Sequence, residues 1–295
     1  MTEAMTETMT ETMIEALRAL GVLAEPPCPE HVAIAEALEL PPPPSADEHM
    51  AVLGFQLPPY ASIYLGAEGM LGGEARDRIA GFWRALGGQP PREPDHLSVL
   101  CGALADLTDP RRAADAPLRI ARAALYAEHL ASWMPPYLAA VRRIGSPFYA
   151  AWASTLDAVL TAEAEVLGPP PGLPLALRAA PPPAGPPADL DALLGAVLAP
   201  VQLGAVLARD DLVRCAAALG LGLRAGERRF ALRALLAQDT AGVLGWLAGE
   251  VRRQADAYGD RAATAAWWQA RGQAGACWLD GLARDAVGPP TTAIA

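Results

Sequence analysis

The chain has 295 residues and a net charge of −10, and all 23 of its basic residues are arginines. Ten acids and only Arg18 lie in residues 1–50, whereas the rest of the chain is close to neutral, so it lacks the concentrated basic footprint that nucleic-acid binding requires. The uncharged run Ala192 to Ala208 is shorter than the ~20 apolar residues that span a bilayer. We therefore expect neither nucleic-acid binding nor stable membrane insertion.

The cysteines favour a reduced, cytoplasmic protein, because the four of them lie far apart and no signal-peptide pattern begins the chain. Cys28 and His31 have the spacing of half a zinc site, but no second pair completes the four ligands, so we expect no metal and no other cofactor. Alanine and leucine dominate the apolar residues while β-branched residues are sparse, which favours an all-α fold. The length favours two domains.

The N-terminal 13 residues repeat a Met-Thr-Glu unit with period four and carry little apolar surface, so residues 1–13 are predicted to be a disordered acidic tail. Apolar residues then indicate two short helices, near 14–20 and 32–38, with Pro26-Pro27 between them. The proline run at 41–44 ends this segment, because proline lacks the backbone donor that a helix needs.

The middle of the chain shows the apolar spacing i, i+3, i+4, i+7 of amphipathic helices. Pro135-Pro136 is expected to break or kink one of them, whereas Ser146 and Pro147 form a good helix start as N-cap and first helical residue. The helices predicted from this spacing are 74–87, 94–107, 117–134 and 147–167.

A stretch dominated by proline separates the middle of the chain from its C-terminal part and is expected to be a stiff, extended linker. Helical periodicity returns after it and predicts a small helical bundle. The predicted organisation is a disordered tail (1–13), a first helical domain (14–168), the linker (169–188), a second helical domain (189–286) and a disordered tail (287–295).

Two segments are unusual for purely structural sequence. The first, LPPYASIYLG at 57–66, carries Tyr60 and Tyr64, which one helical turn would place on the same face. They are either core aromatics or one wall of a peptide groove, and their spacing does not decide between these alternatives.

The second segment is Glu93-Pro94-Asp95-His96. A proline flanked by two carboxylates suits the positive end of a helix dipole, but this does not explain the histidine. Neighbouring residues in a helix do not face each other, and no serine or cysteine in a glycine-rich elbow is visible. We therefore do not expect a catalytic dyad, or an enzyme.

These segments occur in a specific order: LPPYASIYLG, EPDHLSVL, HLASWMPPYLAAV and SPFYAAW. This order resembles the TorD/DmsD/NarJ family of redox-enzyme maturation chaperones, over about residues 48–167. Tyr60 and Tyr64 stand where some relatives have tryptophans, and Glu93 to His96 match the motif at a helix start. His129 and Trp133 match the third motif.

The resemblance implies an all-helical cytoplasmic chaperone with a TorD-like domain and no catalytic residue. Such a protein binds the twin-arginine signal peptide or N-terminal region of an apo-molybdoenzyme of the dimethyl-sulfoxide-reductase type and holds it until its cofactor is inserted. Asp95 is expected to make a charged contact and His96 a polar or gating contact, beside an apolar wall of tyrosines. The implied peptide-binding residues are Tyr60, Tyr64, Glu93, Pro94, Asp95, His96, His129 and Trp133.

Two alternatives remain open. An all-helical adaptor or scaffold without signal-peptide binding predicts that Tyr60, Tyr64 and His96 are buried and packed on one another. An enzyme would need His96 to meet a nucleophile or metal, with His129 as one candidate. The second domain has arginines at 224, 228, 229 and 233, which form either a solvated helix face or a docking surface for the client or for the acidic residues 1–50. A homodimer is also left open.

Overall fold

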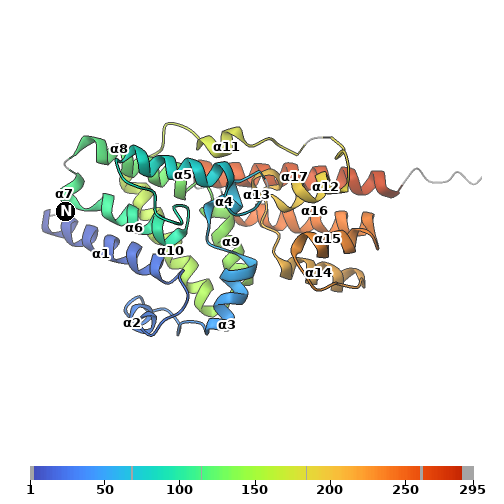
Figure 1. Cartoon of the computed structure of the whole chain (residues 1–295), viewed down its shortest axis with the longest axis horizontal. Helices are drawn as coiled ribbons and strands as arrows, with labels where there is room; N and C mark the ends of the chain where they lie inside the picture. Colours follow the sequence, from blue (N-terminus) through green and yellow to red (C-terminus); the bar gives the residue numbers. More distant parts are fainter. Residues whose placement is uncertain (1–2, 68, 114, 184, 260–261, 288–295) are drawn as a thin grey trace, which may run out of the picture. The chain divides into compact units, whose positions relative to one another are not determined.

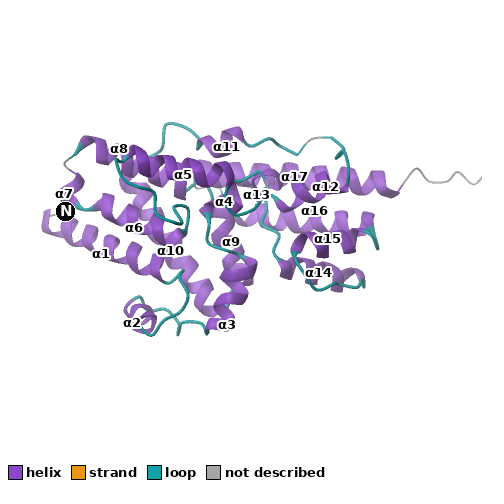
Figure 2. Ribbon diagram, viewed as in Figure 1, coloured by secondary structure: helices purple, strands orange, loops and turns teal. Residues whose placement is uncertain are grey.

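The computed structural model describes residues 3–67, 69–113, 115–183, 185–259 and 262–287. All regular secondary structure in these ranges is helical, which confirms the all-α prediction (Figure 1 and Figure 2). Within the same ranges, no helix combines the length and the apolar character needed to cross a membrane.

The chain divides into two compact units. The first comprises the residues up to Gly66 together with Met70–Arg178, and the second comprises Ala67–Gly69 together with the residues from Ala179 onward. The division therefore lies inside the proline-rich segment. That segment is not extended throughout, because it contains the short helix α11 (Leu175–Ala179).

The first unit contains short and long helices joined by proline-rich loops. Its elements are α1 (Glu3–Val22), α2 (Glu30–Ala37), α3 (Ala46–His49), the π-helix η1 (Met50–Gln56), α4 (Ala61–Leu65), α5 (Gly73–Ala85), α6 (Leu97–Thr108), α7 (Pro110–Ala113), α8 (Ala116–Ala124), the π-helix η2 (Leu125–Leu130), α9 (Met134–Ile144), α10 (Pro147–Leu167) and the start of α11.

The core of the first unit lies where α1 packs along α6 and also meets α10 (Figure 1). Leu17 and Leu20 are fully buried on the inward face of α1, as their three-residue spacing predicts. The indole Nε1 of the buried Trp152 donates a hydrogen bond of 2.9 Å to the carbonyl of Leu20. Because helix C-terminal carbonyls lack partners within the helix, this bond satisfies one of them and ties the end of α1 to α10.

The prediction of disorder at 1–13 is wrong from Glu3 onward, because α1 begins there. Residues 1–2 lie outside the described residues. Extending an existing helix costs far less than nucleating one, and alanine, methionine and glutamate all favour helix. The repeat therefore continues the helix whose later turns pack on α6. The predicted tail at 287–295 falls outside the described residues except for Val287, the last residue of α17.

The helix predicted over 117–134 also differs. It begins as α8, widens into η2 and ends at Leu130. Pro135 and Pro136 then occupy the first turn of α9, where a missing backbone N–H leaves no hydrogen bond unmade. The prolines thus start a helix instead of kinking one. Ser146 does precede Pro147 at the start of α10, but its hydroxyl makes no capping bond.

The second unit is a helical bundle, whose long α16 and α17 form its most extensive packing contact. Its elements are α12 (Leu190–Leu198), α13 (Pro200–Leu203), α14 (Arg209–Leu219), α15 (Arg228–Leu236), α16 (Thr240–Ala257) and α17 (Ala263–Val287). Close approach of α13 and α17 depends on glycine. Gly204, at φ +81°, lies against the backbone of Gly272, and a Cβ at Gly275 would meet the carbonyl of Leu203.

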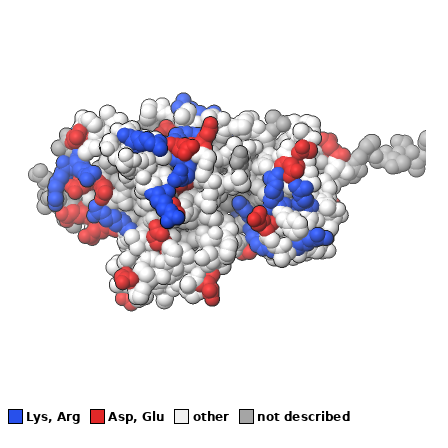
Figure 3. Space-filling view, viewed as in Figure 1, with Lys and Arg blue, Asp and Glu red and all other residues white. Residues whose placement is uncertain are grey.

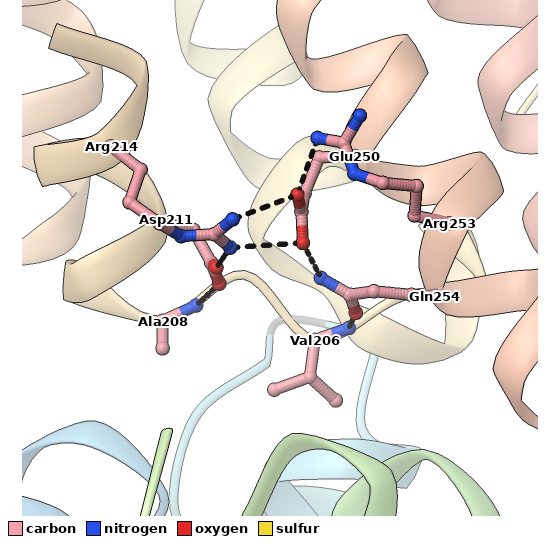
Figure 4. Close-up of polar contacts among 7 residues, drawn as sticks. All are labelled: Val206, Ala208, Asp211, Arg214, Glu250, Arg253 and Gln254. Carbon is pink, nitrogen blue, oxygen red and sulfur yellow. Dashed lines mark hydrogen bonds and ion pairs between the residues drawn. The ribbon is translucent and has the colours of Figure 1, made fainter. Parts of the chain in front are cut away.

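A buried acidic pair stabilises this bundle (Figure 4). The Arg214 guanidinium on α14 contacts both Asp211 and Glu250, two carboxylates that are almost completely buried. Glu250 also accepts hydrogen bonds from Arg253 at 2.7 Å and from the amide of Gln254 at 3.1 Å. Because each buried carboxylate oxygen has a donor, the network joins α14 to α16 without an unpaired charge.

The arginine cluster of the second unit is largely engaged within that unit. Arg229 and Arg233 both contact Asp191, while Arg228 donates to the carbonyl of Leu207 at 2.7 Å. Figure 3 shows acidic and basic side chains interspersed on the visible face of the molecule, without a large field of one sign. This arrangement fits a solvated helix face.

Candidate functional site

Two of the sequence motifs lie side by side, in what we call the junction: residues 58–62 and 93–98. The backbone N–H of Leu97 donates to the carbonyl of Pro59 at 2.8 Å, and that of Ala61 donates to the carbonyl of Asp95 at 3.0 Å. These bonds form an isolated antiparallel bridge between Tyr60 and His96. The junction therefore joins the start of α4 to the start of α6.

Asp95 is buried in the junction and is only 2% exposed. Its Oδ2 accepts a hydrogen bond of 3.2 Å from the backbone N–H of Ser62, in the first turn of α4. The first N–H groups of a helix have no partner within it, so Asp95 supplies one from a different segment. The carboxylate from which a charged contact to a peptide is expected is therefore buried and bonded to α4.

His96 is the N-cap of α6, which begins at Leu97 and not at Pro94. Its Nδ1 accepts a hydrogen bond of 3.2 Å from the backbone N–H of Ser98 and also lies 2.7 Å from the Ser98 hydroxyl. The sequence pattern predicts no capping role for this histidine, whereas the structure assigns it one. Burial lowers the pKa of His96, and the nearby carboxylates of Glu25, Glu93 and Asp95 offset part of this effect.

Tyr60 and Glu93 form the more accessible side of the junction. The Tyr60 hydroxyl donates to Glu93 Oε2 at 2.8 Å, and Glu93 is exposed while Tyr60 is half-buried. Burial, followed by the hydrogen bond to Glu93, raises the pKa of Tyr60. The Tyr60 ring packs edge-on against His96, with 4.7 Å between ring centroids. Pro94 is buried.

Glu25 completes this surface from a distant part of the sequence. Its carboxylate accepts a hydrogen bond from the Ser98 hydroxyl and lies 3.4 Å from His96 Nδ1, and its side chain is 46% exposed. No local pattern indicates this contact, because Glu25 follows α1 and is separated from Ser98 by 73 residues. We call Glu25, Tyr60 and Glu93 the rim.

Tyr64 does not share a wall with Tyr60. Tyr60 is the N-cap of α4 with extended backbone angles, so the one-turn relation expected from the spacing does not apply. Tyr64 is buried, stacks on Trp133 with 5.2 Å between ring centroids, and donates its hydroxyl to the carbonyl of Pro58 at 3.0 Å. It belongs to the aromatic core beneath the junction.

His129 and Trp133 also belong to that core. The Trp133 indole donates to the carbonyl of His129 at 2.8 Å, and both side chains are buried. The His129 ring packs edge-on against Phe82. Burial, together with the positive charge of Arg78, lowers the pKa of His129 to about 4. The third motif thus supports the site from below and contributes little to its accessible face.

The burial and contacts of these residues bear on the scaffold alternative and on the enzyme alternative. Tyr64 and His96 are buried, as the scaffold alternative predicts, but Tyr60 remains partly accessible and packs on His96 without joining Tyr64. For the enzyme alternative, the Ser98 hydroxyl lies 2.7 Å from His96 Nδ1, and it donates a hydrogen bond to the Glu25 carboxylate. Among the described residues, no group of three or more histidines, cysteines or acids could hold a metal ion.

Replacing Asp95 with alanine is expected to lower the unfolding free energy of the first unit by about 1–3 kcal/mol, because the buried N–H of Ser62 loses its acceptor. Asp95→Asn is the matched control, since its amide keeps one acceptor oxygen and should lose less. Chemical denaturation measures both variants. Equal stability of Asp95→Ala and the wild type would show that water replaces the carboxylate.

Residues 53–139 match the model of a protein family described as nitrate reductase delta subunit. The matched span contains the junction and all but the last two residues of the third motif, and it supports the resemblance drawn from the motifs. It ends before SPFYAAW and before most of the second unit. No curated protein matches the chain.

Proposed function

We propose, from the match of residues 53–139 to the nitrate reductase delta subunit family, that this chain is a cytoplasmic chaperone in molybdoenzyme assembly and that its rim binds the signal peptide or N-terminal segment of the client. The family is one of molybdoenzyme maturation chaperones. The observation that carries the proposal is the placement of two accessible carboxylates, Glu25 and Glu93, around the partly exposed ring of Tyr60.

The rim has the chemistry that an arginine pair requires. A guanidinium forms paired, charge-assisted hydrogen bonds with a carboxylate and also stacks on an aromatic face. Glu93 is exposed and its partner is a neutral hydroxyl, so it can accept a guanidinium without breaking an ion pair with the protein. The charged contact first assigned to Asp95 thus passes to Glu93, with Glu25 as the second carboxylate.

The buried members of the motifs act as positioning residues in this proposal. Asp95 holds α4, His96 caps α6, and Tyr64 and Trp133 support the loop that carries Tyr60. Their loss would misplace the rim and would also lower stability. Only the rim residues combine accessibility with polar groups that a peptide can reach, so they give the cleaner test.

The test is binding of a fluorescent twin-arginine signal peptide to the full chain, measured by anisotropy. Glu93→Gln should weaken binding by about tenfold, or ~1.4 kcal/mol, because a charge-assisted bond becomes a neutral one. Tyr60→Phe, which keeps the ring and loses the bond to Glu93, should have a smaller effect. A peptide with alanines in place of both arginines should bind weakly and should respond little to Glu93→Gln.

Glu165→Gln, an exposed change on α10 outside the junction, is the control and should leave binding unchanged. If the wild type binds the peptide but Glu93→Gln and Tyr60→Phe bind it equally well, the rim is not the binding site. If the wild type binds no signal peptide and recovers no oxidoreductase on co-purification, the chaperone proposal fails and the adaptor alternative is favoured.

A further inference from the structure

The chain between α11 and α12 lies against α17 and is held there by side chains of that helix (Figure 1). The two terminal nitrogens of Arg271 donate to the carbonyl of Pro181 at 2.5 Å and to the carbonyl of Ala180 at 2.9 Å. The indole Nε1 of Trp278 donates to the carbonyl of Gly185 at 2.8 Å. We call residues 180–183 and 185–187 the strap.

The side chains that hold the strap share one face of α17. Trp267, Arg271 and Trp278 follow one another at four and seven positions, which a helix of 3.6 residues per turn places on the same side. The Arg271 guanidinium lies over the Trp267 ring, at 4.5 Å from the ring centroid. Both indoles are partly exposed. The face therefore presents two tryptophans, with an arginine held between them by a cation–π contact.

The strap has the composition of a polyproline II segment. It contains five prolines, which favour an extended backbone and offer no N–H group. The carbonyl oxygens of such a segment have no partner within it. Among the described residues of the strap, none takes part in a backbone–backbone hydrogen bond. The donors on α17 thus meet the acceptors that a proline-rich backbone leaves unpaired.

The spacing of donors on α17 matches the spacing of carbonyls on the strap. Polyproline II rises about 3.1 Å per residue, so Pro181 and Gly185 are about 12 Å apart when the strap is extended. An α-helix rises about 1.5 Å per residue, so Arg271 and Trp278 are about 10 Å apart along α17. The long side chains of arginine and tryptophan accommodate this small difference.

The strap contributes little to the core of the second unit. Pro181, Pro182, Gly185 and Pro186 are exposed. The buried apolar cluster of this unit includes none of the described strap residues. The strap can therefore leave α17 without opening the core, because what it gives up is mainly the hydrogen bonds to Arg271 and Trp278.

We propose that the α17 face formed by Trp267, Arg271 and Trp278 is a recognition site for proline-rich segments, that the strap is its resident ligand, and that a proline-rich segment of another protein binds there by displacing the strap. Aromatic-lined surfaces are a recurring means of binding polyproline II, whose preformed backbone loses little entropy on binding. The strap itself shows which chemistry the face accepts.

Covalent attachment gives the strap an advantage over a separate ligand. A tethered segment has an effective concentration on the order of mM, so it competes strongly with any peptide in solution. The strap therefore limits access to the face until a partner displaces it. This inference does not depend on the proposed binding at the rim, because all of its contacts lie in the second unit.

Anisotropy of a fluorescent peptide with the sequence of residues 179–188, AAPPPAGPPA, tests the proposal. The wild type is compared with a strap variant, in which the full chain carries serine in place of all five strap prolines. The strap variant should bind the peptide at least about tenfold more tightly than the wild type, because its tethered competitor is weakened. A peptide with serines in place of its prolines should bind weakly to both proteins.

Further substitutions in the strap variant locate the site. Arg271→Gln removes the guanidinium donors and should weaken peptide binding about tenfold, whereas Trp278→Phe keeps a ring, loses the N–H and should weaken it about threefold. Arg284→Gln, an exposed change on α17, is the matched control and should leave binding unchanged. Circular dichroism checks that each variant keeps its helices, and either of the first two suffices if the other unfolds.

Three results would overturn the proposal. The first is a strap variant that fails to bind the proline peptide, or that binds the serine peptide equally well. The second is equal peptide affinity for Arg271→Gln, Trp278→Phe and Arg284→Gln. The third is a wild-type dimer in sedimentation velocity that is lost in the strap variant, because the face would then take the strap of a second copy and not a segment of another protein.

Discussion

Replacing Glu163 with alanine is expected to lower the unfolding free energy of the first unit by about 3–5 kcal/mol. Glu163 on α10 is completely buried and accepts two hydrogen bonds from Arg122 on α8, at 2.6 Å from Nε and 2.5 Å from the terminal nitrogen. Arg122 is itself only 13% exposed. The substitution therefore leaves a guanidinium largely removed from water without its counter-charge, and this desolvation is the main cost.

Two further variants isolate the cause of this effect. Glu165→Ala changes an exposed acid on the same helix and should cost less than about 0.5 kcal/mol. The double replacement Arg122→Leu with Glu163→Leu removes both charges and should recover most of the loss. Denaturant unfolding followed by tryptophan fluorescence measures all three proteins. Similar stabilities for Glu163→Ala and Glu165→Ala would mean that water reaches Arg122 and solvates it.

In the second unit, Glu250→Gln is expected to cost about 3 kcal/mol at neutral pH. Burial by itself would raise the pKa of Glu250, but hydrogen bonds from Arg214, Arg253 and Gln254 outweigh it and lower the pKa from 4.5 to about 2 (Figure 4). Each unit of pKa shift corresponds to about 1.4 kcal/mol of stability. The charged form of this carboxylate therefore stabilises the folded bundle.

The sign of the pH dependence follows from the lowered pKa. The stabilisation by Glu250 is complete above about pH 4.5 and is lost as the pH falls toward about 2. The stability difference between wild type and Glu250→Gln should therefore shrink over this range. Hydrogen exchange of the α16 amides reports on the second unit alone. Asp256→Asn, an exposed change on α16, should show no such difference, and a constant gap at all pH values would contradict the assignment.

The motif residues contribute to the proposed site in two ways: the buried ones hold the fold, and the exposed ones are accessible to a peptide. Asp95 and His96 satisfy backbone donors at the starts of α4 and α6, so their polar atoms are occupied by the fold. Glu93 keeps an exposed carboxylate beside Tyr60. Because a peptide competes only for groups that are accessible, contact is assigned to the rim, and the buried residues fix its geometry.

The sequence by itself determined the features that depend on local spacing. Apolar periodicity gave the amphipathic helices, for example α5 and α10, and the order of motifs identified a segment that the family match supports. Local spacing was less reliable at helix ends. Residues 3–13 continue α1, and Pro135-Pro136 begin α9, because packing of the adjoining turns decides where a helix extends.

Only the tertiary structure decided the partners of the polar groups. The contact of Glu25 with Ser98 and the bond between His49 and Tyr149 join residues that are 73 and 100 positions apart. No local pattern specifies such pairs, since they depend on how helices of different segments pack. Burial also depends on how the helices pack. Tyr64 lies in the core and Tyr60 at the rim, and the buried Asp95, which was expected to contact a peptide, bonds to α4.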